Sequence, residues 1–496
     1  MRRRPRCLIA FSVLFTVACG GAATPELQLI EDVAEAMGGL RSVSQTAALT
    51  VEGQGRTFRL GQNTRPRADL PYYQVENYLL QVDYANQRWR LGQDRTTTFL
   101  TGGGQLYGAR QTYGLDGDVA YDEQGDGAVR ASDKVAADRW AEMYHNPLGI
   151  VLLGLDETST VSNLREGGAE RVVDIVAANG TQFTLHVSGD TGLPSKVTSS
   201  SYHPNLGDVT IETLFDGYQE MGGLGGFQAR LTLPRNYTTN LDRFTISRYS
   251  TTADTNADVG DLSAPPDVRA VPPPMATVTV DVEEVTDGVW RLAGQSHHSA
   301  LLEFEDFLVL VEAPQSEART LAVIESAREL RPDKSLRYVI NTHHHFDHSA
   351  GIRAAVSEGL TIVTHRTNRS FYEDMVARRH SIVQDALTRN AQPLTLEAVS
   401  SEEPFEITDG TRTLQIVTVV DDLHSDGMLM AYLPRERILF EVDAFSPSAA
   451  ASPFAETLLR NIEDRGLRVE TIVPLHGAIA TLEDLESAVE QEAQAP

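Results

Sequence analysis

Residues 342–348 concentrate side chains that can bind a metal ion. Within this segment, His343, His345, Asp347 and His348 follow the spacing His-x-His-x-Asp-His. Imidazole and carboxylate groups are the neutral-pH ligands that suit zinc and similar divalent ions. Because two of the histidines alternate along an extended loop, their rings turn to one side, and the last two residues reach a second point. The spacing therefore predicts a place for two metal ions side by side, which is a device for activating water.

Two flanking segments place this motif on a loop between a strand and a helix. Residues 336–340 are a short run of β-branched and aromatic side chains, which predicts a strand. Residues 349–356 begin a pattern that is typical of a helix. Loops between such elements often carry functional groups. We therefore expect the motif to be presented at the end of a strand.

The motif resembles the signature of the metallo-β-lactamase superfamily of metal-dependent hydrolases. Three further residues match the remaining ligand positions of that family, in the family's order. They are His424, Asp443 and His476, and each lies at the end of a predicted strand. Four segments in the correct order are much stronger support than any one histidine. The resemblance covers about residues 280–490.

The resemblance also assigns a role to each ligand. The implied set is His343, His345 and His424 for one ion, Asp347, His348 and His476 for the other, and Asp443 as the bridge between them. Asp347 would in addition be catalytic, because it can orient the attacking hydroxide while it remains a ligand. Two zinc ions per chain are expected, with iron as the alternative metal.

Four further residues are expected near the metal site but are not assigned as ligands. The chain carries Glu312 where the family usually has an aspartate, at a position that orders loops and does not bind metal, so little effect is expected. By alternation, His344 points away from its neighbours and is expected behind the ligands or at the surface. His297 and His298 fall between two predicted strands, either on the rim of the metal site or in a solvated turn.

The order of the predicted elements indicates two domains. Residues 276–490 alternate strands and helices, which favours a layered α/β domain, and the resemblance implies the αββα sandwich of the metallo-β-lactamase fold. Residues 24–250 form a β-rich domain of unknown role after an opening helix, and they resemble the curved-sheet lipoprotein-carrier folds of the periplasm. The proline-rich residues 251–275 are expected to be a semi-stiff linker.

The composition excludes some classes of function. A net charge of −27 over 496 residues would repel nucleic-acid phosphates, so we expect a small-molecule substrate and no nucleic-acid partner. The only cysteines, Cys7 and Cys19, lie within the first 23 residues. An internal disulfide and a cysteine metal ligand are therefore excluded. The sequence does not indicate an oligomeric state.

Residues 1–23 are expected to form a signal peptide. Four arginines precede an apolar run, residues 8–18, that is too short to span a bilayer. The run ends beside Cys19, in a context that resembles a bacterial lipoprotein processing site. A lipidated Cys19 would attach the chain to a membrane, and the Gly20 that follows resembles outer-membrane lipoproteins facing the periplasm. Without lipidation, the protein would be free in the periplasm.

The resemblance implies an exported zinc-dependent hydrolase that uses a metal-bound hydroxide on an ester, lactone, thioester or similar bond. Three alternatives stay open. The same ligand geometry serves mononuclear-iron sulfur dioxygenases, because zinc and iron share ligand types. A β-lactamase would fit the compartment, although β-lactamases of this superfamily usually lack a bridging aspartate such as Asp443. A binding lipoprotein with a vestigial metal domain would be distinguished by metal analysis.

Overall fold

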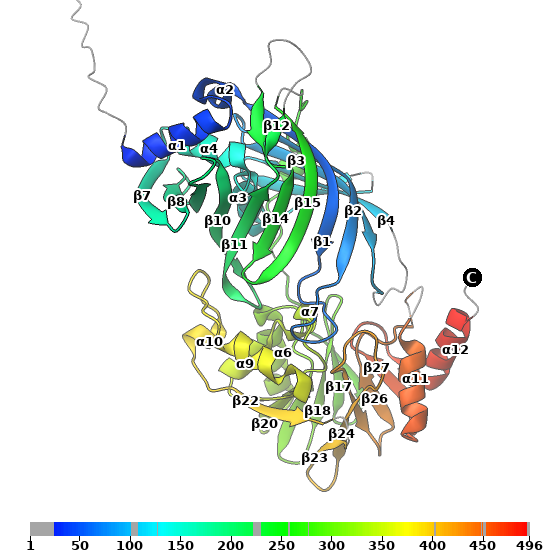
Figure 1. Cartoon of the computed structure of the whole chain (residues 1–496). Helices are drawn as coiled ribbons and strands as arrows, with labels where there is room; N and C mark the ends of the chain where they lie inside the picture. The colour runs from blue at the N-terminus through cyan, green and yellow to red at the C-terminus, as the bar shows by residue number, and fades with distance from the viewer. Residues whose placement is uncertain are drawn as a thin grey trace, which may run out of the picture.

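The chain folds into a large curved sheet and a layered α/β sandwich, which lie against each other (Figure 1). The computed structural model describes residues 24–100, 108–125, 127–221, 230–255, 258–275, 277–400, 403–447, 449 and 453–493. The predicted signal peptide and Cys19 lie outside the described residues. Within them, no helix combines the length and the apolar character needed to cross a membrane.

The first region is one antiparallel sheet of 13 strands. Across the sheet, the strands are β6 (Gly127–Arg130), β5 (Val119–Gln124), β4 (Gly108–Asp116), β3 (Arg88–Thr97), β2 (Tyr72–Asp83), β1 (Ala48–Phe58), β15 (Phe244–Asp254), β14 (Asn236–Leu241), β11 (Gly207–Asp216), β10 (Pro194–His203), β9 (Gln182–Ser188), β8 (Glu170–Val176) and β7 (Thr160–Gly167). In β9, Phe183, Leu185 and Val187 alternate with more exposed residues and are buried. That alternation buries one face of a strand.

Four helices cover the buried face of this sheet. They are α1 (Pro25–Ala36), α2 (Leu40–Gln45), α3 (Asp133–Met143) and α4 (Pro147–Leu155). The apolar α4 is buried along most of its length, and it begins at Asn146, whose side chain accepts a hydrogen bond from the backbone N–H of Leu148 (2.9 Å). Such caps satisfy amide groups that the first helical turn leaves free. A separate two-stranded ribbon consists of β12 (Gln219–Met221) and β13 (Leu231–Leu233).

The second region is a sandwich of two mixed sheets. The first sheet contains β16 (Asp281–Thr286), β17 (Val289–Ala293), β18 (Ser299–Glu303), β19 (Phe307–Val311), β20 (Ser335–Ile340), β21 (Thr361–His365) and β22 (Thr395–Val399). The second contains β23 (Phe405–Thr408), β24 (Thr413–Thr418), β25 (Leu429–Leu433), β26 (Ile438–Glu441), β27 (Thr471–Pro474) and β28 (Ala480–Thr481). Apolar residues of both sheets form one buried cluster between them.

Helices cover the outer faces of the sandwich. One face carries α6 (Glu317–Leu330), α7 (Phe346–Ser349), α8 (Ile352–Ser357), η1 (Arg366–Asn368), α9 (Arg369–Ala377) and α10 (Ala386–Arg389); the other carries α11 (Ala455–Asp464) and α12 (Leu482–Ala493). In α6, Val323, Ile324 and Ala327 recur at helical spacing and are buried against the first sheet. The predicted fold class, an αββα sandwich after a β-rich region, is confirmed.

The proline-rich segment is anchored to the β-rich sheet over part of its length. It contains the short helix α5 (Pro266–Ala270), whose Val268 is buried against β5. The backbone N–H of Ala264 donates to the Asp116 carboxylate (2.8 Å), which also pairs with Arg269. These contacts limit the freedom of the expected linker.

The two regions meet along the loop between β1 and β2, which reaches down beside α7 in Figure 1. Gly61 in this loop has a positive φ of 74°, and a Cβ atom there would lie 2.2 Å from the Phe346 ring. Only glycine allows this approach. The Asn205 side chain donates to the backbone carbonyl of Phe346 (3.1 Å), and Arg378 pairs with Asp242. The β-rich region therefore contacts the helix that follows the His-x-His motif.

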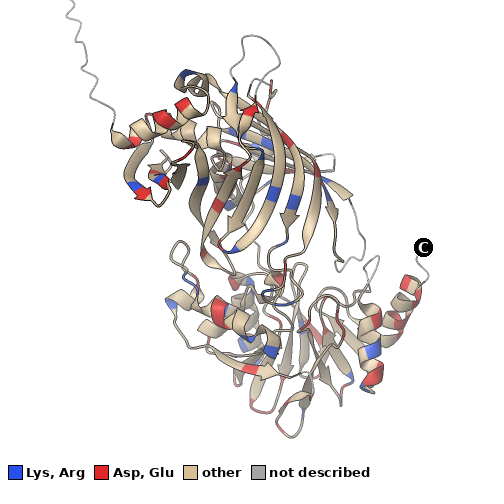
Figure 2. Cartoon of the chain, in the orientation of Figure 1, with Lys and Arg blue, Asp and Glu red and all other residues tan. Residues whose placement is uncertain are grey.

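Acidic residues occur on elements of both regions, with several on α1 and on α12 (Figure 2). This distribution agrees with the acidic, solvated surface that the sequence indicates.

Candidate metal centre

The motif loop begins where β20 ends, and a buried carboxylate fixes its first residues. Glu312, which follows β19, accepts a hydrogen bond from the backbone N–H of Thr342 (2.7 Å). The side chain of Asn341 donates to Glu312 (3.4 Å) and accepts from the Tyr372 hydroxyl. Glu312 is 1% exposed and has a φ of 71°. The glutamate thus orders the loop, as the sequence predicts for this position.

The first group of metal-binding side chains contains three histidines and one aspartate. His343, His345, His424 and Asp443 each offer one ligand atom, and these atoms lie within 4.8 Å of one another. Their arrangement brings the motif loop together with two loops of the second sheet, those after β24 and after β26.

Each histidine of this group has one buried nitrogen without a well-formed hydrogen bond to the described part of the chain: Nε2 of His343, Nδ1 of His345 and Nε2 of His424. Two of these atoms, on His343 and His424, face the Asp443 carboxylate. Their other nitrogens face partners in two cases: His343 Nδ1 lies 3.1 Å from the Thr342 hydroxyl, and His345 Nε2 lies 3.0 Å from the backbone carbonyl of Asn63. Since a carbonyl only accepts, His345 Nε2 carries the proton and leaves the Nδ1 lone pair available. Buried, unpaired nitrogens that converge on one point fit a metal ion.

The second group consists of His297, His348 and His476. Nε2 of His348 and Nε2 of His476 are 3.2 Å apart. The other nitrogen of His348 donates to Glu312 (3.2 Å), so its Nε2 is free to act as an acceptor. The carboxylate that orders the loop therefore also orients a candidate ligand.

Asp443 joins the two groups. Its Oδ1 lies 2.9 Å from His476 Nε2, and its Oδ2 lies 2.9 Å from His348 Nε2. The same Oδ2 lies 3.3 Å from His343 Nε2 and 3.1 Å from His424 Nε2. Asp443 has a φ of 57°, an uncommon conformation for a residue other than glycine that is often found at functional sites. One carboxylate thus faces both groups of histidines.

Asp347 lies beside the second group. Its Oδ1 accepts a hydrogen bond from the Gln62 side chain (2.8 Å), and its Oδ2 is 3.6 Å from His297 Nε2. The structure therefore brings six of the seven predicted ligands into the two groups and places Asp347 next to them.

Sequence comparison agrees with this geometry. The family model "Metallo-beta-lactamase superfamily" matches residues 292–447. This part of the chain belongs to the metallo-beta-lactamase superfamily. No curated protein matches the chain.

Several solved structures that resemble part of the chain are described as metallo-beta-lactamases. One is FIM-1 from Pseudomonas aeruginosa in its mono-zinc form, at 20% identity and a TM-score of 0.35, covering 44% of this chain and 98% of that chain. Another is from Hirschia baltica, at 20% identity and a TM-score of 0.33, covering 43% and 97%. A third is from Pontibacter korlensis, at 14% identity and a TM-score of 0.34, covering 44% and 100%.

The electrostatics of the metallo-beta-lactamase site keep its carboxylates ionised. Burial alone would raise the pKa of Asp443, but the contacts with His348, His343 and His424 outweigh burial and hold this pKa well below its usual range. Asp347 behaves similarly: burial opposes ionisation, yet the contact with His297 and the proximity of His348 lower its pKa. Both carboxylates can therefore act as anionic ligands or acceptors.

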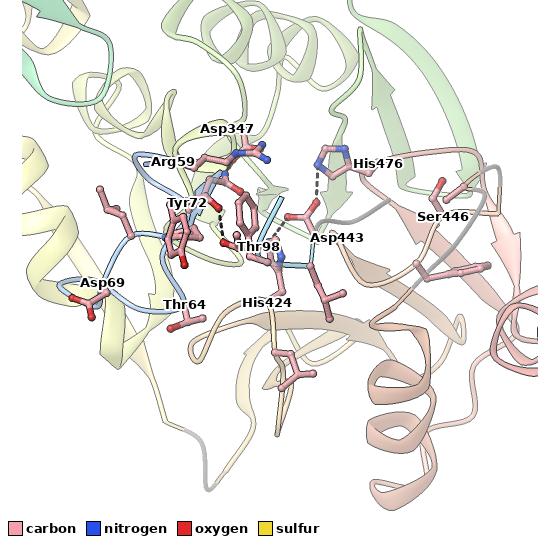
Figure 3. A pocket seen from close by; sticks show the side chains of 18 residues that line it. Arg59, Thr64, Asp69, Tyr72, Thr98, Asp347, His424, Asp443, Ser446 and His476 are labelled. Carbon is pink, nitrogen blue, oxygen red and sulfur yellow. Dashed lines mark hydrogen bonds and ion pairs between the residues drawn. The ribbon is translucent and has the colours of Figure 1, made fainter. Parts of the chain in front are cut away.

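A pocket of about 670 Å³ opens over the site. Asp347, His424, Asp443 and His476 contribute to its lining (Figure 3). The lining also includes residues of the β-rich region, from the β1–β2 loop and the segment that follows β3.

The sequence does not assign some of the residues that surround the metallo-beta-lactamase site. His297 joins the second group, whereas the sequence leaves it between a rim position and a turn. The position of His297 after β17 could have indicated a candidate ligand, because the predicted ligands also follow strands. Gln62 and Asn63 come from the other region, where the sequence indicates no catalytic constellation. His344 is 1% exposed, so its position is behind the ligands and not at the surface.

Proposed function

We propose that this protein is a zinc-dependent hydrolase that acts on an ester, lactone, thioester or similar bond of a small molecule. One observation carries the proposal. Three buried histidine nitrogens, on His343, His345 and His424, converge with the Asp443 carboxylate, and Asp443 also contacts His348 and His476. His344 and His380 also have unpaired buried nitrogens but belong to neither group, so the convergence is what distinguishes the candidate site.

The donor set supports zinc, with two ions per chain. Imidazole nitrogen and carboxylate oxygen are zinc ligands, and no cysteine lies outside the first 23 residues. His343, His345 and His424 would hold one ion, and His348 and His476 would hold the other together with Asp347 or His297. Asp443 would bridge them. When bound, such ions lower the pKa of water and polarise the bond under attack.

Residues of the chain would organise the rest of the reaction. Because the contact with His297 keeps the pKa of Asp347 low against the effect of burial, its carboxylate can accept a hydrogen bond from the attacking water and aim it. Glu312 holds His348 in one tautomer, and the Asn63 carbonyl does the same for His345. Fixed tautomers keep the ligand lone pairs directed at the site.

Metal analysis combined with a substrate panel tests the proposal. The purified protein is supplemented with zinc or iron(II), its bound metal is measured by elemental analysis, and hydrolysis of esters, lactones, thioesters and β-lactams is followed. We expect two zinc ions per chain and turnover of at least one ester-like class. A protein that takes up no transition metal contradicts the proposal, and iron-dependent oxygen consumption with a persulfide substrate would favour a sulfur dioxygenase.

We also propose that the protein is exported and anchored through Cys19. A basic segment, a short apolar run and a cysteine before small residues support this. Cys19→Ser should move the protein from the membrane fraction to the soluble periplasmic fraction, because a lipidated N-terminus with more than one acyl chain is what gives stable attachment. Unchanged membrane association of the processed variant would contradict lipid anchoring.

A further inference from the structure

The β-rich region supplies one wall of the pocket above the metal ligands. The loop between β1 and β2 contributes Arg59, Gln62 and Leu70, and the segment that follows β3 contributes Phe99 and Leu100. Figure 3 shows these segments facing Asp443 and His476 across the pocket. The region with no assigned role therefore shapes the space in which a substrate would bind.

This wall is fixed to the candidate ligands. The Gln62 side chain donates to Asp347 (2.8 Å), and the Asn63 carbonyl accepts from His345 (3.0 Å). The Thr64 carbonyl accepts from the backbone N–H of Asp426 (2.8 Å), two residues after His424. Since the loop contacts both sides of the site, its side chains have set positions relative to the metal ligands.

Arg59 places a positive charge in this wall. Its backbone N–H donates to the Pro71 carbonyl (2.8 Å), its Nη1 donates to the Tyr73 hydroxyl (3.3 Å), and its guanidinium carbon lies 5.9 Å from the centre of the Phe99 ring. No carboxylate of the described residues lies within ion-pairing distance of Arg59. The nearby arginines of the same loop, by contrast, have partners: Arg65 lies 3.8 Å from Asp426, and Arg67 lies 3.9 Å from Asp374.

The charge in this wall indicates the anion that would suit it. Among the described residues that line the pocket, Arg59 is the single lysine or arginine, and it lies in the wall formed by the β-rich region. This wall therefore offers one cation to an anionic group of a substrate. A carboxylate carries one charge and matches the planar guanidinium fork. Phe99, Leu100 and other apolar side chains of the pocket would contact the apolar part of the same molecule.

We propose that the β1–β2 loop is a working part of the active site and that Arg59 binds a carboxylate group of the substrate. The inference rests on the proposed function, because the reacting bond must sit at the metal ligands while the carboxylate reaches Arg59. It specifies the substrate as a carboxylic acid that carries the scissile bond at a distance from the acid group. Arg59 is thereby a specificity-determining residue.

Binding of matched thiols tests this without relying on turnover. Thiolates bind zinc, so ω-mercaptocarboxylic acids of increasing chain length, and their uncharged amides, can be titrated calorimetrically into the zinc-loaded protein. For at least one chain length, we expect the acid to bind about tenfold more tightly than its amide, the lower end of the range for hydrogen bonds to charged groups. In Arg59→Gln the preference should fall to about one, and Arg59→Lys should restore part of it.

Arg65→Gln is the matched control, because it removes the same charge from the same loop at a side chain that does not line the pocket. It should keep the wild-type preference for the acid. Equal affinities for acid and amide at every chain length in the wild type, or equal weakening of both by Arg59→Gln, would overturn the inference while the metal site stands. Absence of bound zinc in the wild type would overturn the proposed function and this inference together.

Discussion

Buried histidines serve different purposes in the two regions of the molecule. In the β-rich region, His145 is 8% exposed and uses both ring nitrogens, one 3.0 Å from the Thr213 hydroxyl and the other 2.8 Å from the Ser199 hydroxyl. In the metallo-beta-lactamase region, the inward-facing nitrogens of His343 and His424 are buried, and neither makes a well-formed hydrogen bond to the described residues. Burial alone therefore does not identify a ligand. The unpaired nitrogen and the common point at which such nitrogens meet are the informative features.

The strongest test of this contrast removes the residue that joins the two groups of ligands. Asp443→Ala deletes the carboxylate that contacts histidines of both groups, so four imidazoles lose their shared anion. We expect less than two zinc ions per chain and a loss of activity of at least about a thousandfold, since metal ions supply several kcal/mol of transition-state stabilisation. Elemental analysis and steady-state kinetics measure the two effects.

The corresponding change in the β-rich region serves as the control. His145→Ala should leave the zinc content of the folded protein at the wild-type value. If Asp443→Ala instead retains both ions and full activity, the bridging role assigned to Asp443 is wrong.

His145→Ala should reduce the stability of the fold, whereas Asp443→Ala should reduce metal binding and activity. The substitution leaves the Thr213 and Ser199 hydroxyls without their partner and opens space beside Phe183, whose ring centre lies 5.9 Å from the His145 ring. We expect the free energy of unfolding to fall by about 3 kcal/mol, from unsatisfied polar groups together with a cavity. Urea denaturation followed by circular dichroism gives the value. A stability loss below about 0.5 kcal/mol, the usual range for a surface position, would contradict a structural role.

The pH dependence of stability offers a third test. Burial lowers the pKa of His145 from its usual value to about 4. Below pH 6.5 the unfolded chain takes up a proton at this residue, whereas the folded chain does so only near pH 4, so acidification favours unfolding in this window. The contribution of His145 to this loss between pH 7 and pH 5 should be about 2 kcal/mol.

His145→Asn isolates that contribution, because asparagine does not titrate. The difference in unfolding free energy between wild type and variant, measured by urea denaturation at pH 7 and pH 5, should shrink by about 2 kcal/mol at the lower pH. A difference that is the same at both pH values would show that His145 titrates normally in the folded state.

The sequence predicts the sandwich and its motif well, because the patterns that specify them lie within short segments of the chain. The His-x-His-x-Asp-His spacing encodes its own geometry, because the residues share one short loop after β20. The alternation of apolar side chains within β2 and β9 is likewise a local pattern, and it is typical of a strand. Long-range pairings are different: β1 pairs with β15, whose residues follow about 200 positions later, as in the pair Val51 and Ala253. No local pattern specifies which distant strand completes a sheet.

The same limit explains what the sequence does not reveal about the site. Gln62 contacts Asp347 across 285 positions, and this contact exists only because the β-rich region docks on α7. The docking depends on Gly61, which allows the loop to pass the Phe346 ring. The Gly-Gln-Asn-Thr-Arg-Pro sequence predicts a turn, but it carries no information about which surface that turn will meet.

The smallest expected effect tests whether the loop acts on the site or merely touches it. Gln62→Met keeps the side chain's length and removes the amide that donates to Asp347 (2.8 Å). Asp347 would then lose one of the contacts that set its orientation, and partners of this kind typically affect metal affinity or activity by 10–100-fold. Because Asp347 keeps its contact with His297, we expect about a tenfold decrease in kcat with little change in stability. Arg65→Gln in the same loop should leave kcat unchanged, since its side chain points to Asp426. If Gln62→Met and Arg65→Gln have the same kcat, the β1–β2 loop contacts the metal site without affecting the reaction. The metallo-beta-lactamase region would then carry out the reaction without help from Gln62, although both regions line the pocket.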